Sequence, residues 1–118
     1  MKYMLLIHQG TTALPGTEDW DRLSADEQQA VYRDYQAINQ TPGVSPGVQM
    51  QPPEAATTVR VQEGETLTTD GPFVAIKEAL GGYLLYEAPD LDAAIELAAR
   101  IPAARLGGAV EVRPLKEA

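Results

Sequence analysis

The single histidine and a few charged residues are the side chains in this sequence that can carry chemistry. His8 ends the apolar run 3–7, where a strand would reach the edge of a sheet and where ligands often bind. Histidine ordinarily titrates at about pH 6.5, so His8 is the natural general acid or base at neutral pH. A lone histidine at a strand end also serves as a group hydrogen-bonded to solvent or backbone. The sequence leaves both roles open.

A second group of candidates lies in the segment 69–73, which reads Thr-Asp-Gly-Pro-Phe. Asp70 is the second catalytic candidate, because its carboxylate can orient His8 or a ligand. Its alternative role is to accept backbone N–H bonds in a tight turn, in which Gly71 would take an unusual φ. Phe73 is the only phenylalanine. It is a candidate substrate contact or a plug that pins the loop onto the core.

Three charged residues complete the candidate substrate-binding set. Lys77 and Glu78 are adjacent in the sequence and follow the tight loop. They can act as an anion anchor and a general base, or form a solvated salt bridge. Arg60 lies between two valines in a strand-like segment, so its side chain points away from theirs. It faces either water or a cleft, where it would clamp a carboxylate.

Composition limits the partners that this chain can have. It has 118 residues, with 9 Lys and Arg against 17 Asp and Glu, and a formal charge of −8. That length fits a single domain, residues 1–118. The negative charge repels phosphate backbones and anionic lipid, so we expect neither a nucleic acid nor a membrane partner. No apolar run approaches a signal peptide or a membrane span, which makes a cytoplasmic location the expectation.

The motifs of metal and cofactor sites are missing from the sequence. One histidine and no cysteine leave only carboxylates, and these show no metal-binding spacing. No G-x-G-x-x-G follows a strand-like segment, and no phosphate-binding loop is present. We therefore expect no metal and no cofactor.

Two helices are predicted from their capping residues. Ser24 and Glu27 have the spacing of a capping box, which starts a helix whose apolar stripe ends near residues 41–43. Asp90 is the candidate N-cap of the second helix, which Pro102 ends. The apolar positions expected to face the core are Val31, Tyr35 and Ile38 in the first helix and Leu91, Ala94, Ile95, Ala98 and Ile101 in the second.

The strands are predicted from continuous or alternating apolar patterns. Residues 3–8 and 81–87 are continuous apolar runs, and residues 109–113 alternate. Residues 57–62 and 66–69, separated by Glu-Gly-Glu, read as a β-hairpin. The proline-rich segment 43–53 permits at most a short or edge strand.

This order predicts an α+β ferredoxin-like sandwich with both helices on one face of an antiparallel sheet. The continuous apolar strands require cover on both faces, yet two helices cover only one. The same face of a second copy would cover the other, giving a homodimer that encloses a small-molecule site between its sheets. The alternative is that the hairpin folds over that face within one chain.

The sequence also resembles a known family, the DGPF branch of the YCII-related proteins. The resemblance covers nearly the whole chain. It rests on the opening Met1-Lys2-Tyr3-Met4-Leu5-Leu6-Ile7, then Thr57-Thr58-Val59-Arg60, Thr69-Asp70-Gly71-Pro72-Phe73, Lys77-Glu78, Leu80-Gly81-Gly82-Tyr83, Leu91-Asp92-x-Ala94, Pro102-Ala103-Ala104 and Val110-Glu111-Val112-Arg113-Pro114.

The resemblance implies a dimeric α+β barrel in a bacterial cytoplasm. In the wider superfamily a His–Asp pair near the inter-sheet cleft is proposed for acid–base work, and the usual histidine position of the first helix is Tyr32 here. Relatives are often found beside sigma factors. Two functions are therefore expected: a dimer that binds, and without a cofactor transforms, a small oxygenated or aromatic compound, or a non-catalytic accessory protein associated with a sigma factor. The sequence does not decide whether the chain is an enzyme.

Overall fold

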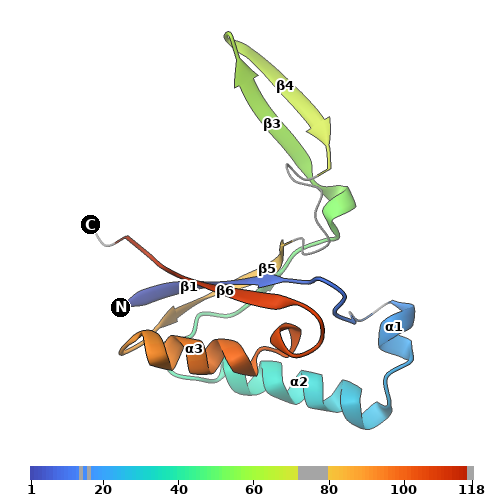
Figure 1. Ribbon diagram of the computed structural model, residues 1–118, viewed down its shortest axis with the longest axis vertical. Coiled ribbons are helices and arrows are strands. Elements are labelled where there is room, and N and C mark those ends of the chain that lie inside the picture. The colour runs from blue at the N-terminus through green and yellow to red at the C-terminus, as the bar shows by residue number, and fades with distance from the viewer. Residues whose placement is uncertain (14, 16, 72–79, 117–118) are drawn as a thin grey trace.

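An antiparallel sheet of four strands organises the molecule (Figure 1). The computed structural model describes residues 1–13, 15, 17–71 and 80–116. The strand order is β2-β5-β1-β6, the order of a ferredoxin-like sandwich, which agrees with the predicted α+β class. The strands are β1 (Lys2–His8), β2 (Val48–Gln49), β5 (Leu80–Glu87) and β6 (Ala109–Pro114). β2 is the short edge strand that the prolines predicted.

Helices α2 (Ala25–Asn39) and α3 (Leu91–Arg100) lie on one face of this sheet (Figure 1). The predicted capping box starts α2: Ser24 Oγ accepts a hydrogen bond from the Glu27 N–H at 3.1 Å, and the Glu27 carboxylate accepts one from the Ser24 N–H at 3.0 Å. The Asp90 carboxylate accepts a hydrogen bond from the Ala93 N–H at 2.8 Å and caps α3. Both predicted starts are confirmed.

The short helix α1 (Glu18–Asp21) was not predicted. Its single buried residue is Trp20, whose ring meets the Tyr32 ring edge to face with centroids 5.4 Å apart. Only one turn of helix forms here, so no apolar period was visible in the sequence. Short turns of 3₁₀ helix also form at Pro53–Ala55 and Pro102–Ala104.

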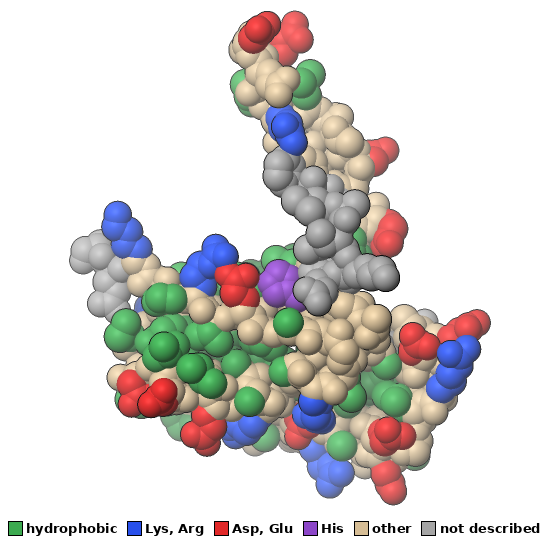
Figure 2. Space-filling model, viewed as in Figure 1, with side chains coloured by type: hydrophobic (Ala, Val, Ile, Leu, Met, Phe, Trp, Pro, Cys, Tyr) green, Lys and Arg blue, Asp and Glu red, His purple; other side chains and the backbone are tan. Residues whose placement is uncertain are grey.

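The hairpin of β3 (Thr57–Gln62) and β4 (Glu65–Asp70) stands away from the sheet (Figure 1). It forms a separate two-stranded sheet, and nearly all its residues are exposed. In Figure 2 acidic side chains lie at its tip. The Cα radius of gyration is 16.2 Å, against about 13.5 Å for a compact domain of this length. The hairpin therefore does not cover the second face of the four-stranded sheet.

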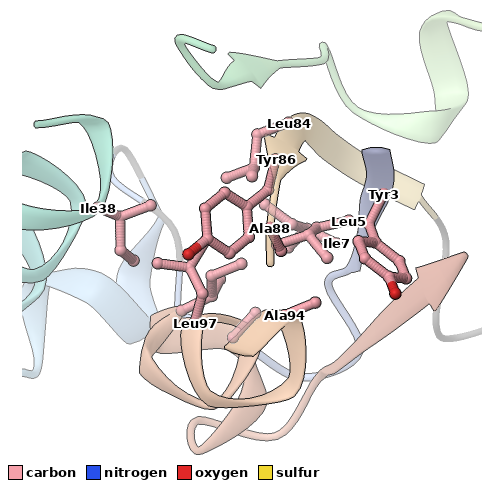
Figure 3. Packing of buried hydrophobic residues seen from close by; sticks show 11 residues of the cluster. Tyr3, Leu5, Ile7, Ile38, Leu84, Tyr86, Ala88, Ala94 and Leu97 are labelled. Atoms are coloured by element: carbon pink, nitrogen blue, oxygen red, sulfur yellow. The ribbon is translucent and has the colours of Figure 1, made fainter. Parts of the chain in front are cut away.

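The core lies between the sheet and the two helices. Alternate strand residues point toward Ile38 of α2 and Leu97 of α3 (Figure 3). In β1 these strand residues are Tyr3, Leu5 and Ile7, and Leu5 is fully buried. The apolar stripe predicted for α3 was partly wrong. Leu91 and Ile95 are 49% and 50% exposed, and Leu97 is buried at 1% instead.

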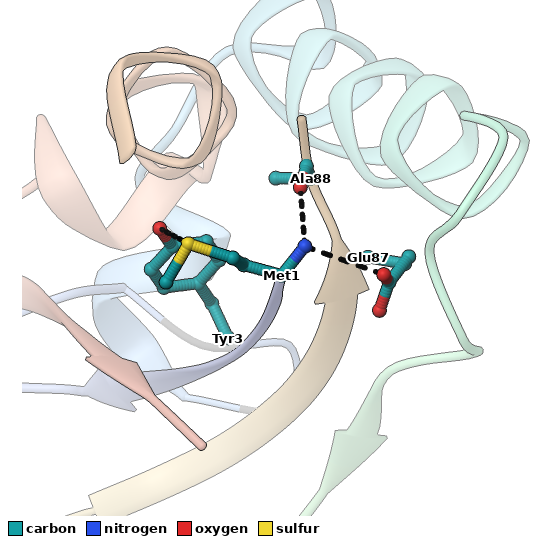
Figure 4. Close-up of polar contacts among 4 residues, drawn as sticks. All are labelled: Met1, Tyr3, Glu87 and Ala88. Carbon is teal, nitrogen blue, oxygen red and sulfur yellow. Dashed lines mark hydrogen bonds and ion pairs between the residues drawn. The ribbon is translucent and has the colours of Figure 1, made fainter. Parts of the chain in front are cut away.

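Met1 is held by hydrogen bonds at the start of β1 (Figure 4). Its amino group donates hydrogen bonds to the Ala88 carbonyl oxygen at 3.0 Å and to the Glu87 carboxylate at 3.3 Å. The Tyr3 hydroxyl donates to the Met1 sulfur at 3.6 Å. These contacts fix the start of β1 against the end of β5, and so set the register that places His8 at the opposite end.

In the part of the chain that the structure describes, no helix has both the length and the apolar character needed to cross a membrane.

Candidate functional site

His8 lies at the end of β1 on the face of the sheet opposite the helices. Its neighbour Ile7 points into the core, so strand alternation turns His8 to the other side. The strand β6 pairs with β1 and brings Glu111 to the same face, opposite Leu6. The sheet therefore joins two residues that are about a hundred positions apart in sequence.

One polar contact at this position joins His8 and Glu111, and it becomes an ion pair when the imidazole is protonated. His8 Nε2 lies 3.5 Å from Glu111 Oε1, and the two side chains are 25% and 39% exposed. Arg113, two residues along β6, pairs with the same carboxylate. Figure 2 shows the histidine beside an acidic and a basic side chain. The result is a short row of polar side chains on the open side of the sheet, with the Glu111 carboxylate between the imidazole and the guanidinium.

The same face of the sheet carries four largely apolar side chains beside this pair. Met4 pairs with Leu85 and Leu6 pairs with Tyr83 across β1 and β5, and all four side chains are partly buried. Residues that oppose each other in a sheet share a face, so these four form one surface next to His8. We call Met4, Leu6, Tyr83 and Leu85 the open face.

A histidine and a carboxylate in contact can move a proton. The carboxylate stabilises the protonated imidazole, and the imidazole can exchange that proton with a hydroxyl or acid brought to the sheet. No group of three or more His, Asp or Glu side chains within the described residues is placed to hold a metal ion. The arrangement thus offers acid–base chemistry beside an apolar surface.

The structure places the other predicted residues away from this pair or outside its description. Asp70 is exposed at the end of β4, opposite Thr57, and Arg60 is exposed within β3. Phe73, Lys77 and Glu78 lie outside the described residues. Glu111, the acidic partner of His8, was not among the predicted site residues. The alternating pattern of residues 109–113 predicted a strand. It did not show how that strand is aligned with β1, and this alignment is what brings Glu111 to His8.

The turn after Asp70 has the predicted backbone. Gly71 has a φ of 96°, in the region that favours glycine. Its N–H donates to the Ala56 carbonyl oxygen at 2.6 Å, and its own carbonyl accepts from the Thr58 hydroxyl at 2.7 Å. These bonds close the base of the hairpin, so a structural reason for Gly71 exists independently of catalysis.

Comparison with known proteins gives two matches. The family model described as the YCII-related domain matches residues 1–118. An uncharacterised protein of Rhizobium meliloti (strain 1021) is 36% identical over an alignment 97 positions long, which covers 78% of each chain. Neither match brings an established activity with it.

Proposed function

The chain belongs to the YCII-related family, and on that premise we propose that it is a homodimer that binds a small oxygenated or aromatic compound. The two copies join through their open faces. His8 and Glu111 exchange a proton with the bound compound, without a cofactor. Phe73, Lys77 and Glu78 remain predicted contributors to this site, whereas Arg60 and Asp70 lie on the exposed hairpin, away from the pair.

The observation that carries the proposal is the contact of His8 with Glu111 at 3.5 Å beside the open face. Met4, Leu6, Tyr83 and Leu85 lie on the side of the sheet away from the helices. The hairpin forms a sheet of its own that stands away from the four-stranded sheet (Figure 1). Packed sheets lie about 10 Å apart. A second copy over this face would bury the apolar residues and enclose each His8–Glu111 pair at the rim of the interface.

The chemistry follows from the pair itself. His8 would take a proton from a hydroxyl or an acidic C–H of the ligand, and the Glu111 carboxylate would stabilise the imidazolium that results. The same proton would return to another position of the ligand or to water. Arg113, on the other side of Glu111, would hold the carboxylate in place during the exchange.

A thermal-shift screen of small aromatic hydroxyl and carboxylate compounds tests this site. A compound that raises the melting temperature of the native chain should lose most of its effect in His8→Gln and part of it in Glu111→Gln. Glu65→Gln on the exposed hairpin is the matched control and should respond like the native chain. Equal shifts in all four proteins would place the ligand elsewhere and overturn the assignment of His8.

A second candidate function is that of an accessory protein, and the hairpin is what favours it. Val59 and Val61 are 58% and 67% exposed, and strand alternation puts them on one face of β3. An arm with exposed valines suits a protein partner, for which the resemblance suggests a sigma factor. Val59→Ser with Val61→Ser should abolish co-purification of a sigma factor with the tagged chain. Unchanged co-purification would remove the hairpin from that role.

A further inference from the structure

Tyr83 is the one residue of the open face whose side chain ends in a hydroxyl. It opposes Leu6 in β1, and Leu6 in turn opposes Glu111 in β6. On the other side of Tyr83, the edge strand β2 brings Val48, which is 46% exposed. Residues that oppose each other share a face of the sheet. The phenol therefore stands between two apolar side chains, and Leu6 separates it from the carboxylate of Glu111.

The hydroxyl of Tyr83 has no hydrogen-bond partner among the residues that the structure describes. Tyr86, three positions later in β5, differs because it is 9% exposed and points into the core (Figure 3). Water can reach Tyr83 in the single chain, since its side chain is only partly buried. A second copy packed about 10 Å above the sheet would remove that water, and a buried hydroxyl without a partner is destabilising.

Two kinds of partner could bond the Tyr83 hydroxyl inside the proposed dimer: a polar group of the second copy, or an atom of the bound compound. The charged groups beside it in the same chain already contact one another. His8 lies 3.5 Å from Glu111, and Arg113 pairs with the same carboxylate. The position of His8 relative to Tyr83 favours the bound compound as the partner.

The spacing of His8 and Tyr83 suits one small functional group. His8 lies two residues beyond Leu6 in β1, just past the point where the register against β5 shifts, so Tyr83 and His8 are diagonal neighbours. Such neighbours are about 7–8 Å apart, within reach of aromatic side chains. A base acts on a carbon about 3–3.5 Å away, and a hydroxyl hydrogen bond is about 2.8 Å long. One carbonyl group and the carbon beside it, with bonds of about 1.2 and 1.5 Å, therefore bridge the imidazole and the phenol.

Charge decides where the oxygen of such a compound should lie. When the imidazole takes a proton from the carbon next to a carbonyl, the electron pair of the C–H bond forms a C=C bond and the negative charge moves to the oxygen. The Glu111 carboxylate repels that charge, whereas a hydroxyl donor stabilises it. Tyr83 is such a donor, and it lies on the side of Leu6 away from Glu111.

We propose that the Tyr83 hydroxyl donates a hydrogen bond to the carbonyl oxygen of the bound compound and stabilises the enolate that forms when His8 takes the proton. The imidazolium then returns the proton to a carbon or to the oxygen of the enolate, so the step consumes no oxidant and no reductant. This role of Tyr83 rests on the function proposed above. It narrows the substrate to a compound with an acidic C–H next to a carbonyl group.

A titration with 4-nitrophenol tests this role, because its ionised form carries an oxyanion where the enolate would and absorbs visible light. At mildly acidic pH the free compound is mostly protonated, and on binding to the native chain it should lose its proton to His8 and turn yellow. Tyr83→Phe, which removes only the hydroxyl, should bind the ionised form at least about tenfold more weakly. Tyr86→Phe, on the core side of the same strand, is the matched control and should bind it as the native chain does.

Three results would overturn this role of Tyr83. The first is equal binding of ionised 4-nitrophenol by the native chain and by Tyr83→Phe. The second is a Tyr83→Phe chain that no longer sediments as a dimer, which would assign the hydroxyl to the second copy. The third is an unchanged absorbance when the native chain meets millimolar 4-nitrophenol.

His8→Gln separates this role from the acid–base site itself. If binding of 4-nitrophenol falls in His8→Gln but not in Tyr83→Phe, the function proposed above stands and Tyr83 has no part in it. If it falls in Tyr83→Phe but not in His8→Gln, the oxyanion is held by Tyr83, and His8 is not the group that takes the proton.

Discussion

His8 and Gln9 are consecutive in the chain, yet their side chains serve opposite faces of the sheet. His8 contacts Glu111 on the open side, and Gln9 lines a cavity between α2 and the sheet on the helix side. The register of β1 against β5 shifts between Ile7 and His8, at the point where the strand ends and the two environments separate. Two consecutive residues therefore place polar side chains on opposite faces of the sheet.

Two leucines of α3 give a direct test of the core. Leu97 is 1% exposed and Leu91 is 49% exposed. Leu97→Ala should lower the free energy of unfolding by about 2–5 kcal/mol, because it leaves a cavity against Ile38 and the sheet. Leu91→Ala should change it by about 0.5 kcal/mol or less. Urea unfolding measures both. An equal decrease in the free energy of unfolding in both variants would mean that Leu91 is buried in the core, as its spacing in the sequence predicted.

The capping box makes stability depend on pH in a defined direction. The hydrogen bonds from Ser24 lower the pKa of Glu27 below its ordinary value of 4.5. A carboxyl whose pKa is lower in the folded state stabilises the fold above its unfolded pKa, and this contribution disappears as the pH falls through the folded pKa.

Glu27→Gln should therefore be less stable than the native chain at pH 7, and the difference should shrink below about pH 4.5. Unfolding of both proteins at a series of pH values measures it. Asp26→Gln, also in the first turn of α2, is the control for the general effect of a helix-terminal charge. A difference that stays constant down to pH 3 would show that the carboxylate of Glu27 is not the group involved.

Gly82 and Gly64 should respond differently to substitution. A Cβ at Gly82 would lie 2.5 Å from the Val48 carbonyl oxygen, whereas one at Gly64 meets nothing within 4 Å but sits at a φ of 79°. Gly82→Ala should cost about 1–3 kcal/mol by forcing β2 away from β5. Gly64→Ala should cost about 1–2 kcal/mol of backbone strain within the hairpin.

Asparagine separates the two causes, because it tolerates a positive φ. Gly64→Asn should recover most of the loss in Gly64→Ala, as read by hairpin amide shifts. Gly82→Asn should be at least as damaging as Gly82→Ala. Recovery at both positions would mean that the approach of Val48 to Gly82 does not limit the packing there.

A charge on the open face should prevent the proposed dimer. Leu6→Glu places a carboxylate among Met4, Tyr83 and Leu85, where a second copy would have to bury it. Sedimentation equilibrium should then give one chain per particle with native circular dichroism. Val61→Glu on the exposed hairpin is the control and should leave the assembly unchanged. A native chain that sediments as a monomer at high micromolar concentration would end the dimer proposal.

Local signals predicted the elements well. The Ser24–Glu27 capping box, the Asp90 cap and the positive φ of Gly71 each depend on residues within three or four positions of one another, and each is confirmed. The predicted hairpin is also present, but its turn has two residues, Glu63 and Gly64, both at positive φ, because Glu65 already belongs to β4 and pairs with Gln62. The YCII-related family is confirmed as well, while the DGPF branch stays a prediction.

The candidate sites depended on distances that the sequence does not contain. The meeting of His8 and Glu111 requires the register of β6 against β1, and the position of the Gln9 side chain requires a residue without a Cβ at position 81. The reversal of Leu91 and Leu97 has a similar cause. The apolar period of α3 allows more than one stripe, and the crossing of the helix over the sheet decides which one is buried.

The hairpin of β3 and β4 should exchange its amide hydrogens faster than the four-stranded sheet. A two-stranded sheet with little burial of its own is marginal in water, so its amide hydrogens should exchange by local opening, long before the four-stranded sheet unfolds. The exchange rate of the hairpin amides therefore responds to contacts that the hairpin makes with another molecule. Any protein or second copy that settles on this arm would slow that exchange while leaving the core rates as they were.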